Sequence, residues 1–182
     1  MLTNAELLSE IDRHFLEPER MARIDTFQRA GRGMHGWFKG EIAHLVQTLA
    51  AGGKLRGWMG DAWITEDRKK WVDLKVDTAD GPLWLEVRAL HHRERTGFGA
   101  DLLSGMTDAI GVTDDVVRLL RVPDGSPMIL LFVYPRPDPQ AWSSLMESYA
   151  QRIHPISVIE QSAIADYPEA LYICKLAVEG AF

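Results

Sequence analysis

The chain has 182 residues, of which 46% are hydrophobic and 25% are charged. These proportions are typical of one soluble globular domain with a sizeable core, and they exclude a disordered or fibrous chain. The formal net charge of −6 argues against a general nucleic-acid coat protein, because such proteins bind through clustered Lys and Arg. A local basic groove remains compatible with this charge.

No stretch approaches the roughly 20 apolar residues that a membrane-spanning helix needs. The first fifteen residues carry acids within their apolar part and no basic leader, unlike a secretory signal. The single cysteine, Cys174, lies in an alternating apolar run, which indicates a packed thiol and excludes an internal disulfide. We therefore expect a cytoplasmic protein without a membrane partner. Nothing in the sequence indicates a homo-oligomer.

The first third of the chain predicts three helices. Apolar residues at spacings of three and four predict one over residues 4–16 and a second over about 18–30. In residues 37–53 the apolar side chains form a narrow stripe, and two glycines supply a stop. Glu41 falls beside this stripe, so we expect its carboxylate to reach the edge of whatever the helix packs on.

The rest of the chain predicts a mixed sheet with further helices. We expect strands over 55–66, 71–76 and 83–90, an interrupted helix over 100–121, a buried strand over 127–135, a helix over 139–152, and strands over 156–164 and 169–179. Strict alternation places Val72, Leu74 and Val76 on one face. The element order predicts an α/β three-layer sandwich, with a mixed central sheet flanked by helices.

Two registers are open for the hairpin that contains Asp73. A tight two-residue turn places Asp73 opposite Arg88, which would be an ordinary cross-strand ion pair. A wider loop over 77–82 places it opposite Glu86, and facing carboxylates require a cation or an Arg nearby. Pro82 favours the wider loop, because the tight turn needs a backbone N–H that proline lacks.

These acids resemble the motif of the PD-(D/E)XK nuclease superfamily. Its core is a helix bearing Glu, then strands bearing Asp and the (D/E)-x-K tripeptide, then a helix and a further buried strand. Glu41 matches the helical Glu, Asp73 the strand Asp, and Glu86 of the sequence LEVRA the second acid. The resemblance implies a catalytic set of Glu41, Asp73, Glu86 and Arg88, with Mg²⁺ or Mn²⁺ held by the three acids.

The resemblance also implies a domain plan and an activity. It implies a single domain over 1–182, with a restriction-endonuclease-like core over 35–134, an N-terminal helical addition over 1–34, and a C-terminal helix and strands over 135–182. The implied activity is metal-dependent hydrolysis of DNA phosphodiester bonds. In that chemistry the ion and the motif Lys activate water and offset charge in the transition state.

The motif departs from the family at Arg88, where the family usually has Lys. The fork of Arg suits phosphate oxygens, but Arg stays protonated and cannot share a proton with water. Three interpretations are therefore open. The chain is an active nuclease with Arg88 on the scissile phosphate, a catalytically degenerate nuclease fold serving as a binding or assembly module, or an α/β protein whose hairpin acids are only salt-bridged.

Basic residues in two segments are candidates for DNA contacts. Residues 20–39 contribute Arg29, Arg32 and Lys39, and the sequence HHRER contributes Arg93. The alternative interpretation is scattered surface charge on helices and loops.

Overall fold

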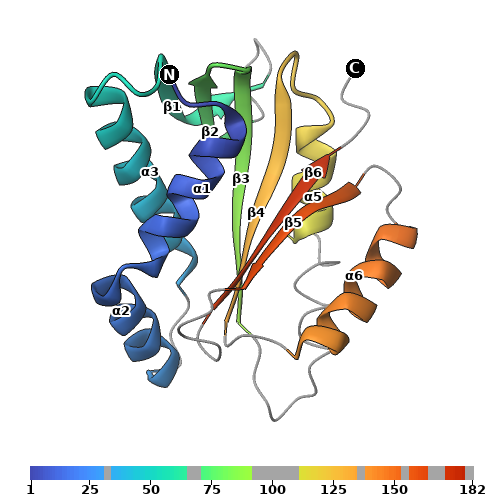
Figure 1. Ribbon diagram of the computed structural model, residues 1–182. Coiled ribbons are helices and arrows are strands. Elements are labelled where there is room, and N and C mark those ends of the chain that lie inside the picture. The colour runs from blue at the N-terminus through green and yellow to red at the C-terminus, as the bar shows by residue number, and fades with distance from the viewer. Residues whose placement is uncertain are drawn as a thin grey trace.

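The computed structural model describes residues 1–30, 34–64, 71–91, 111–134, 138–152, 156–163 and 171–178. Six strands form one mixed sheet in the order β1-β2-β3-β4-β6-β5 (Figure 1). Their bounds are β1 Gly57–Trp63, β2 Trp71–Thr78, β3 Gly81–His91, β4 Ser126–Tyr134, β5 Ile156–Ala163 and β6 Tyr172–Val178. Strands β3 and β4 are parallel, and the other neighbouring pairs are antiparallel.

Helices cover both faces of this sheet (Figure 1). On one face lie α1 (Asn4–Leu16), α2 (Pro18–Arg29) and α3 (His35–Ala51), and on the other lie α5 (Val112–Leu119) and α6 (Pro139–Arg152). The predicted α/β sandwich with a mixed central sheet is confirmed. The predicted helix over 100–121 is described only at its end, as α5, and residues 100–110 lie outside the described part of the chain.

Local signals explain where the first helices begin. Thr3 caps α1 in a reciprocal capping box with Glu6, and Pro18 occupies the first turn of α2, where its missing N–H is not needed.

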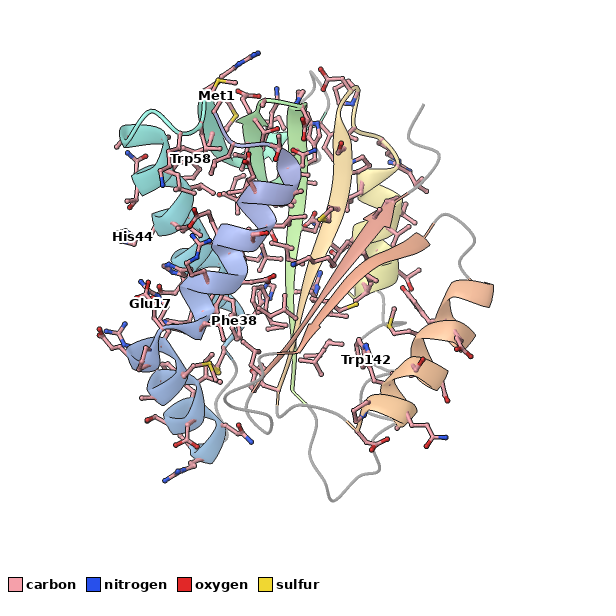
Figure 2. The ribbon with its side chains drawn as sticks, in the orientation of Figure 1. Met1, Glu17, Phe38, His44, Trp58 and Trp142 are labelled. Atoms are coloured by element: carbon pink, nitrogen blue, oxygen red, sulfur yellow. The ribbon has the colours of Figure 1, made fainter. Side chains whose placement is uncertain are left out.

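Packing then fixes the helices on the sheet. The ring of Phe38, labelled in Figure 2, stacks on Phe132 of β4 with centroids 4.3 Å apart. Both rings are fully buried, which stabilises the fold by about 1.5–3 kcal/mol each.

The β2–β3 hairpin has the predicted register but a different turn. Leu74 pairs with Leu85, and Thr78 pairs with Gly81, so Asp73 lies at the level of Glu86. The predicted loop over 77–82 is wrong in width, because both strands continue to a two-residue turn. Pro82 is tolerated inside β3 because the N–H groups directed at β2 come from the odd-numbered residues.

The alternation of β2 breaks at Asp73. Val72 packs in the core beneath α5 and α6, whereas Leu74, two residues later, packs beneath α1–α3. The prediction that both share a face is therefore wrong. The neighbouring strand β1 is irregular at the same level. Asp61 has a φ of +45° there, and the residues on either side of it pair with β2. Because β2 changes face at Asp73, this side chain does not follow the regular alternation of side chains along a strand.

Candidate functional site

Polar side chains from four elements meet where β2 turns away from β3. They are His35 and Lys39 of α3, Asp73 of β2, Glu86 and Arg88 of β3, and Asp115 and Arg118 of α5. Helix α3 approaches from one face of the sheet and α5 from the other. The break in β2 therefore lets side chains of both layers act on the same acids.

Asp73 is held by two donors. Its Oδ1 accepts a hydrogen bond from Lys39 Nζ at 2.5 Å, and its Oδ2 accepts the backbone N–H of Val87 at 2.8 Å. The regular ladder of this hairpin ends at the pair Leu74–Leu85, so the next β3 amide directed at β2 would lack a backbone partner. The Asp73 carboxylate takes that place, which fixes its position while leaving it in contact with a cation.

Glu86 is a buried acid, with 1% of its surface exposed. Burial, the charges of Asp73 and Asp115 and a hydrogen bond with Asp73 raise its pKa to about 9, against the opposing charge of Arg118. The Glu86 carboxyl group is thus protonated at neutral pH. Its Oε1 has no hydrogen-bond partner within the described residues, although Arg118 Nε lies 3.4 Å away.

Arg88 is clamped by an acid that the sequence interpretation did not select. Its Nε and one terminal nitrogen donate to Asp115 at 2.8 and 2.5 Å, and Arg118 contacts the same carboxylate. Asp115 is fully buried, and that burial raises its pKa despite the two guanidinium groups. The structure therefore pairs Arg88 with Asp115 rather than with Asp73, which removes the ion pair expected from the alternative register.

His35 adds a neutral base beside Asp73. Burial and the nearby charges of Lys39 and Arg88 lower its pKa to about 4, so the imidazole is uncharged at neutral pH. Its Nδ1 is buried and has no hydrogen-bond partner in the part of the chain that the structure describes. The same helix face thus carries an ammonium group and an imidazole, one turn apart.

Glu41 is placed elsewhere. Its Oε2 accepts from His14 at 2.9 Å and from Arg20 at 2.8 Å, and these bonds outweigh burial to lower its pKa. Residues two apart on a helix point about 200° apart, so Lys39 and Glu41 of α3 face different neighbours. Because Lys39 contacts Asp73, Glu41 faces α1 and α2. The structure does not bring the predicted third acid to Asp73 and Glu86.

Two of the four predicted DNA contacts lie within the described residues, and each is paired with an acid. Arg29 lies on α2 with its charge paired to Asp25 of the same helix at 2.7 Å, and Lys39 is paired to Asp73. Arg32 and Arg93 lie outside the described residues. The predicted basic groove therefore stays a prediction.

The sequence carried a signal for Asp115 that sequence reasoning missed. The residues Val112, Val116 and Leu119 form the buried stripe of α5, and Asp115 lies within that stripe. An acid at a core position of an amphipathic helix requires a buried cation as partner. The arginines at 88 and 118 answer that requirement.

Among the described side chains, no group of three or more His, Cys, Asp or Glu residues is arranged to hold a metal ion. Within the same residues, no helix is long and apolar enough to span a membrane. Comparisons with protein-family models, curated proteins and solved structures return no match for this chain.

Proposed function

We propose that this protein hydrolyses DNA phosphodiester bonds with a divalent metal held by Asp73 and Glu86. The observation that carries the proposal is the contact between these two carboxyl groups at a break in the sheet, where the buried Oε1 of Glu86 has no hydrogen-bond partner among the described residues. Mg²⁺ is commonly held by one or two carboxylates together with water and substrate phosphate oxygens. Two carboxylates therefore suffice as the protein's share of the site.

The order of elements supports the same proposal. From α3 the chain runs through β1, β2 and β3 to α5 and then to β4, which lies parallel beside β3. This is the order of the PD-(D/E)XK core, and it favours a restriction-endonuclease-like core over residues 35–134. The two acids lie on adjacent strands of that unit, as the motif requires.

Each residue of the cluster has a role in this chemistry. A bound metal supplies Lewis acidity and lowers the pKa of a water molecule. Val87 N–H and Lys39 orient the Asp73 carboxylate, so one metal ligand is fixed in advance. Lys39 also places an ammonium group beside the acids. In the family motif that group comes from the Lys whose position Arg88 occupies here. Arg88, held in place by Asp115, presents a fixed positive charge for phosphate oxygens.

Cleavage assays test the proposal directly. Purified protein is incubated with plasmid and single-stranded DNA in Mg²⁺ or Mn²⁺, beside the variants Asp73→Asn and Glu86→Gln. Asp77→Asn is the matched control, because Asp77 lies on the same strand with 44% of its side chain exposed. We expect both site variants to lose cleavage and the control to retain it. Cleavage that persists in Glu86→Gln would reject the site.

A second candidate function is a nuclease-like fold that binds DNA or a partner without turnover. The clamp on Arg88 favours it, since two of the Arg88 donors are already engaged by Asp115. Calorimetric titration with Mn²⁺ and DNA separates the two candidates. Binding without hydrolysis under any metal condition supports the second, and hydrolysis removes it.

A further inference from the structure

Two exposed tryptophans form a pair beside the carboxylate site. Trp63 ends β1 and Trp71 begins β2, and the two are cross-strand partners. Their rings meet edge to face, with centroids 5.4 Å apart and planes at 77°. Their exposed fractions are 42% and 44%, whereas Trp84 and Trp142 are buried. Both rings therefore leave apolar surface in contact with water, which is unfavourable.

The break in β2 sets this pair on the same side as the site. Val72 points into the core beneath α5 and α6, so its neighbour Trp71 points toward the opposite side, on which α3 lies. There Lys39 of α3 contacts Asp73. Residues two apart in a strand are about 6.5–7 Å apart, which places Trp71 close to Asp73.

We infer that Trp63 and Trp71 form a stacking platform for an unpaired nucleobase of single-stranded DNA. The phosphate next to the stacked base then lies toward Lys39 and the carboxyl groups. Stacking of one base on an aromatic side chain contributes about 1–3 kcal/mol and accepts any base. The inference rests on the proposed function for the role of the neighbouring site, and it names single strands or frayed ends as the substrate.

Charge favours a nucleic acid over an apolar partner. Lys39 keeps 35% of its side chain exposed beside Asp73. A polyanion gains from this ammonium group through counterion release, whereas an apolar partner would have to desolvate it.

The shape of the edge strand disfavours a second copy of this chain. Strand β1 lies at the edge of the sheet, and such edges can pair with the same edge of another molecule. Asp61 interrupts this edge with φ +45° and an exposed carboxylate, two residues before Trp63. Irregular backbone and an exposed charge are features that prevent strand addition.

Fluorescence anisotropy with a labelled oligo-dT strand and a duplex of equal length tests the platform. EDTA and the Glu86→Gln background prevent cleavage during the measurement. We expect tighter binding of the single strand, a loss of tenfold or more in Trp63→Leu/Trp71→Leu, and recovery in Trp63→Phe/Trp71→Phe, which restores aromatic faces. Trp58→Phe is the control on the same strand, because its indole donates to Gln47 of α3 (Figure 2).

Equal binding of single strand and duplex, or wild-type affinity in the Leu variant, would overturn the inference. Dimerisation that the Leu variant abolishes without a change in DNA affinity would overturn it in favour of a second copy. The proposed function fails separately. If DNA binding depends on the tryptophans but the wild-type protein never cleaves DNA, the nuclease proposal is refuted and the platform stands. If the protein cleaves DNA but binding does not depend on the tryptophans, the platform is refuted and the nuclease proposal stands.

Discussion

The carboxyl groups of Asp73 and Glu86, from adjacent strands, share a hydrogen bond in a site that is almost closed to solvent. Two such groups cannot both ionise without strong repulsion, and here Glu86 keeps the proton. A cation that binds both carboxyl groups would therefore displace the proton that they share.

Metal binding should release the proton of Glu86. The neutral acid that predominates below its pKa of about 9 must ionise to hold a divalent ion. Mn²⁺ titrated at pH 7 in buffers of different ionisation enthalpy should displace about one proton, and affinity should rise with pH toward 9. Glu86→Gln should remove both effects. A metal affinity that is flat between pH 6 and 8 would argue against Glu86 as a ligand.

The same proton gives stability a definite pH dependence. In the unfolded chain Glu86 has its ordinary pKa of 4.5, and in the folded chain its pKa is about 9. Between these values the folded state holds a proton that the unfolded state has lost, so this group's contribution falls as pH rises, by up to about 1.4 kcal/mol per pH unit. Urea unfolding of wild type and Glu86→Gln should diverge in slope between pH 5 and 9. Parallel curves would show that the acid is not buried as described.

His35 should act in the opposite direction at acid pH. Its pKa is lowered from 6.5 to about 4, so the folded chain binds fewer protons than the unfolded chain between these values. The contribution of His35 to stability is present above pH 6.5 and is lost as pH falls toward 4. His35→Gln should flatten the acid side of the stability profile measured by urea unfolding. A profile as steep as that of wild type below pH 6 would contradict the assignment.

The secondary structure and the hairpin register were predictable because their signals are local. Apolar spacing placed α1 and α6 at the bounds found in the structure, and Pro82 indicated the register of β2 and β3. The turn was not predictable to the residue. Proline is tolerated within the paired strands as well as outside them, and the register gives Pro82 a position whose missing N–H faces away from β2.

The site was predictable only in part because its assembly depends on long-range packing. The register of the hairpin brings Asp73 to the level of Glu86. The orientation of Glu41 depends on how α1 and α2 pack against α3, and the Asp115 clamp depends on docking α5 against β3. The spacing of residues within one helix or strand does not predict these contacts between elements. The change of face at Asp73 is likewise a tertiary effect that strict alternation misses.

Removing the Asp115 carboxylate should destabilise the fold strongly. Asp115→Asn removes the negative charge that Arg88 and Arg118 share in a buried site, and breaking a buried ion pair in this way costs about 3–5 kcal/mol. Asp114→Asn is a close control, because that neighbour also contacts Arg118 but has 45% of its side chain exposed. We expect its effect to be below about 1 kcal/mol. Similar losses in the two variants, measured by urea unfolding, would refute the clamp.

Glu41→Gln should separate the two acidic sites of the protein. Glu41 bonds to His14 and Arg20 on α1 and α2, so the substitution should lower stability by about 1.5–3 kcal/mol through lost charge-assisted hydrogen bonds. The Mn²⁺ affinity should stay within twofold of wild type, because the metal is proposed to bind Asp73 and Glu86. Parallel urea unfolding and Mn²⁺ calorimetry measure the two quantities. If Glu41→Gln weakens Mn²⁺ binding as much as Glu86→Gln does, all three acids of the motif would have to converge in the metal-bound protein, and α3 would have to turn to bring Glu41 there.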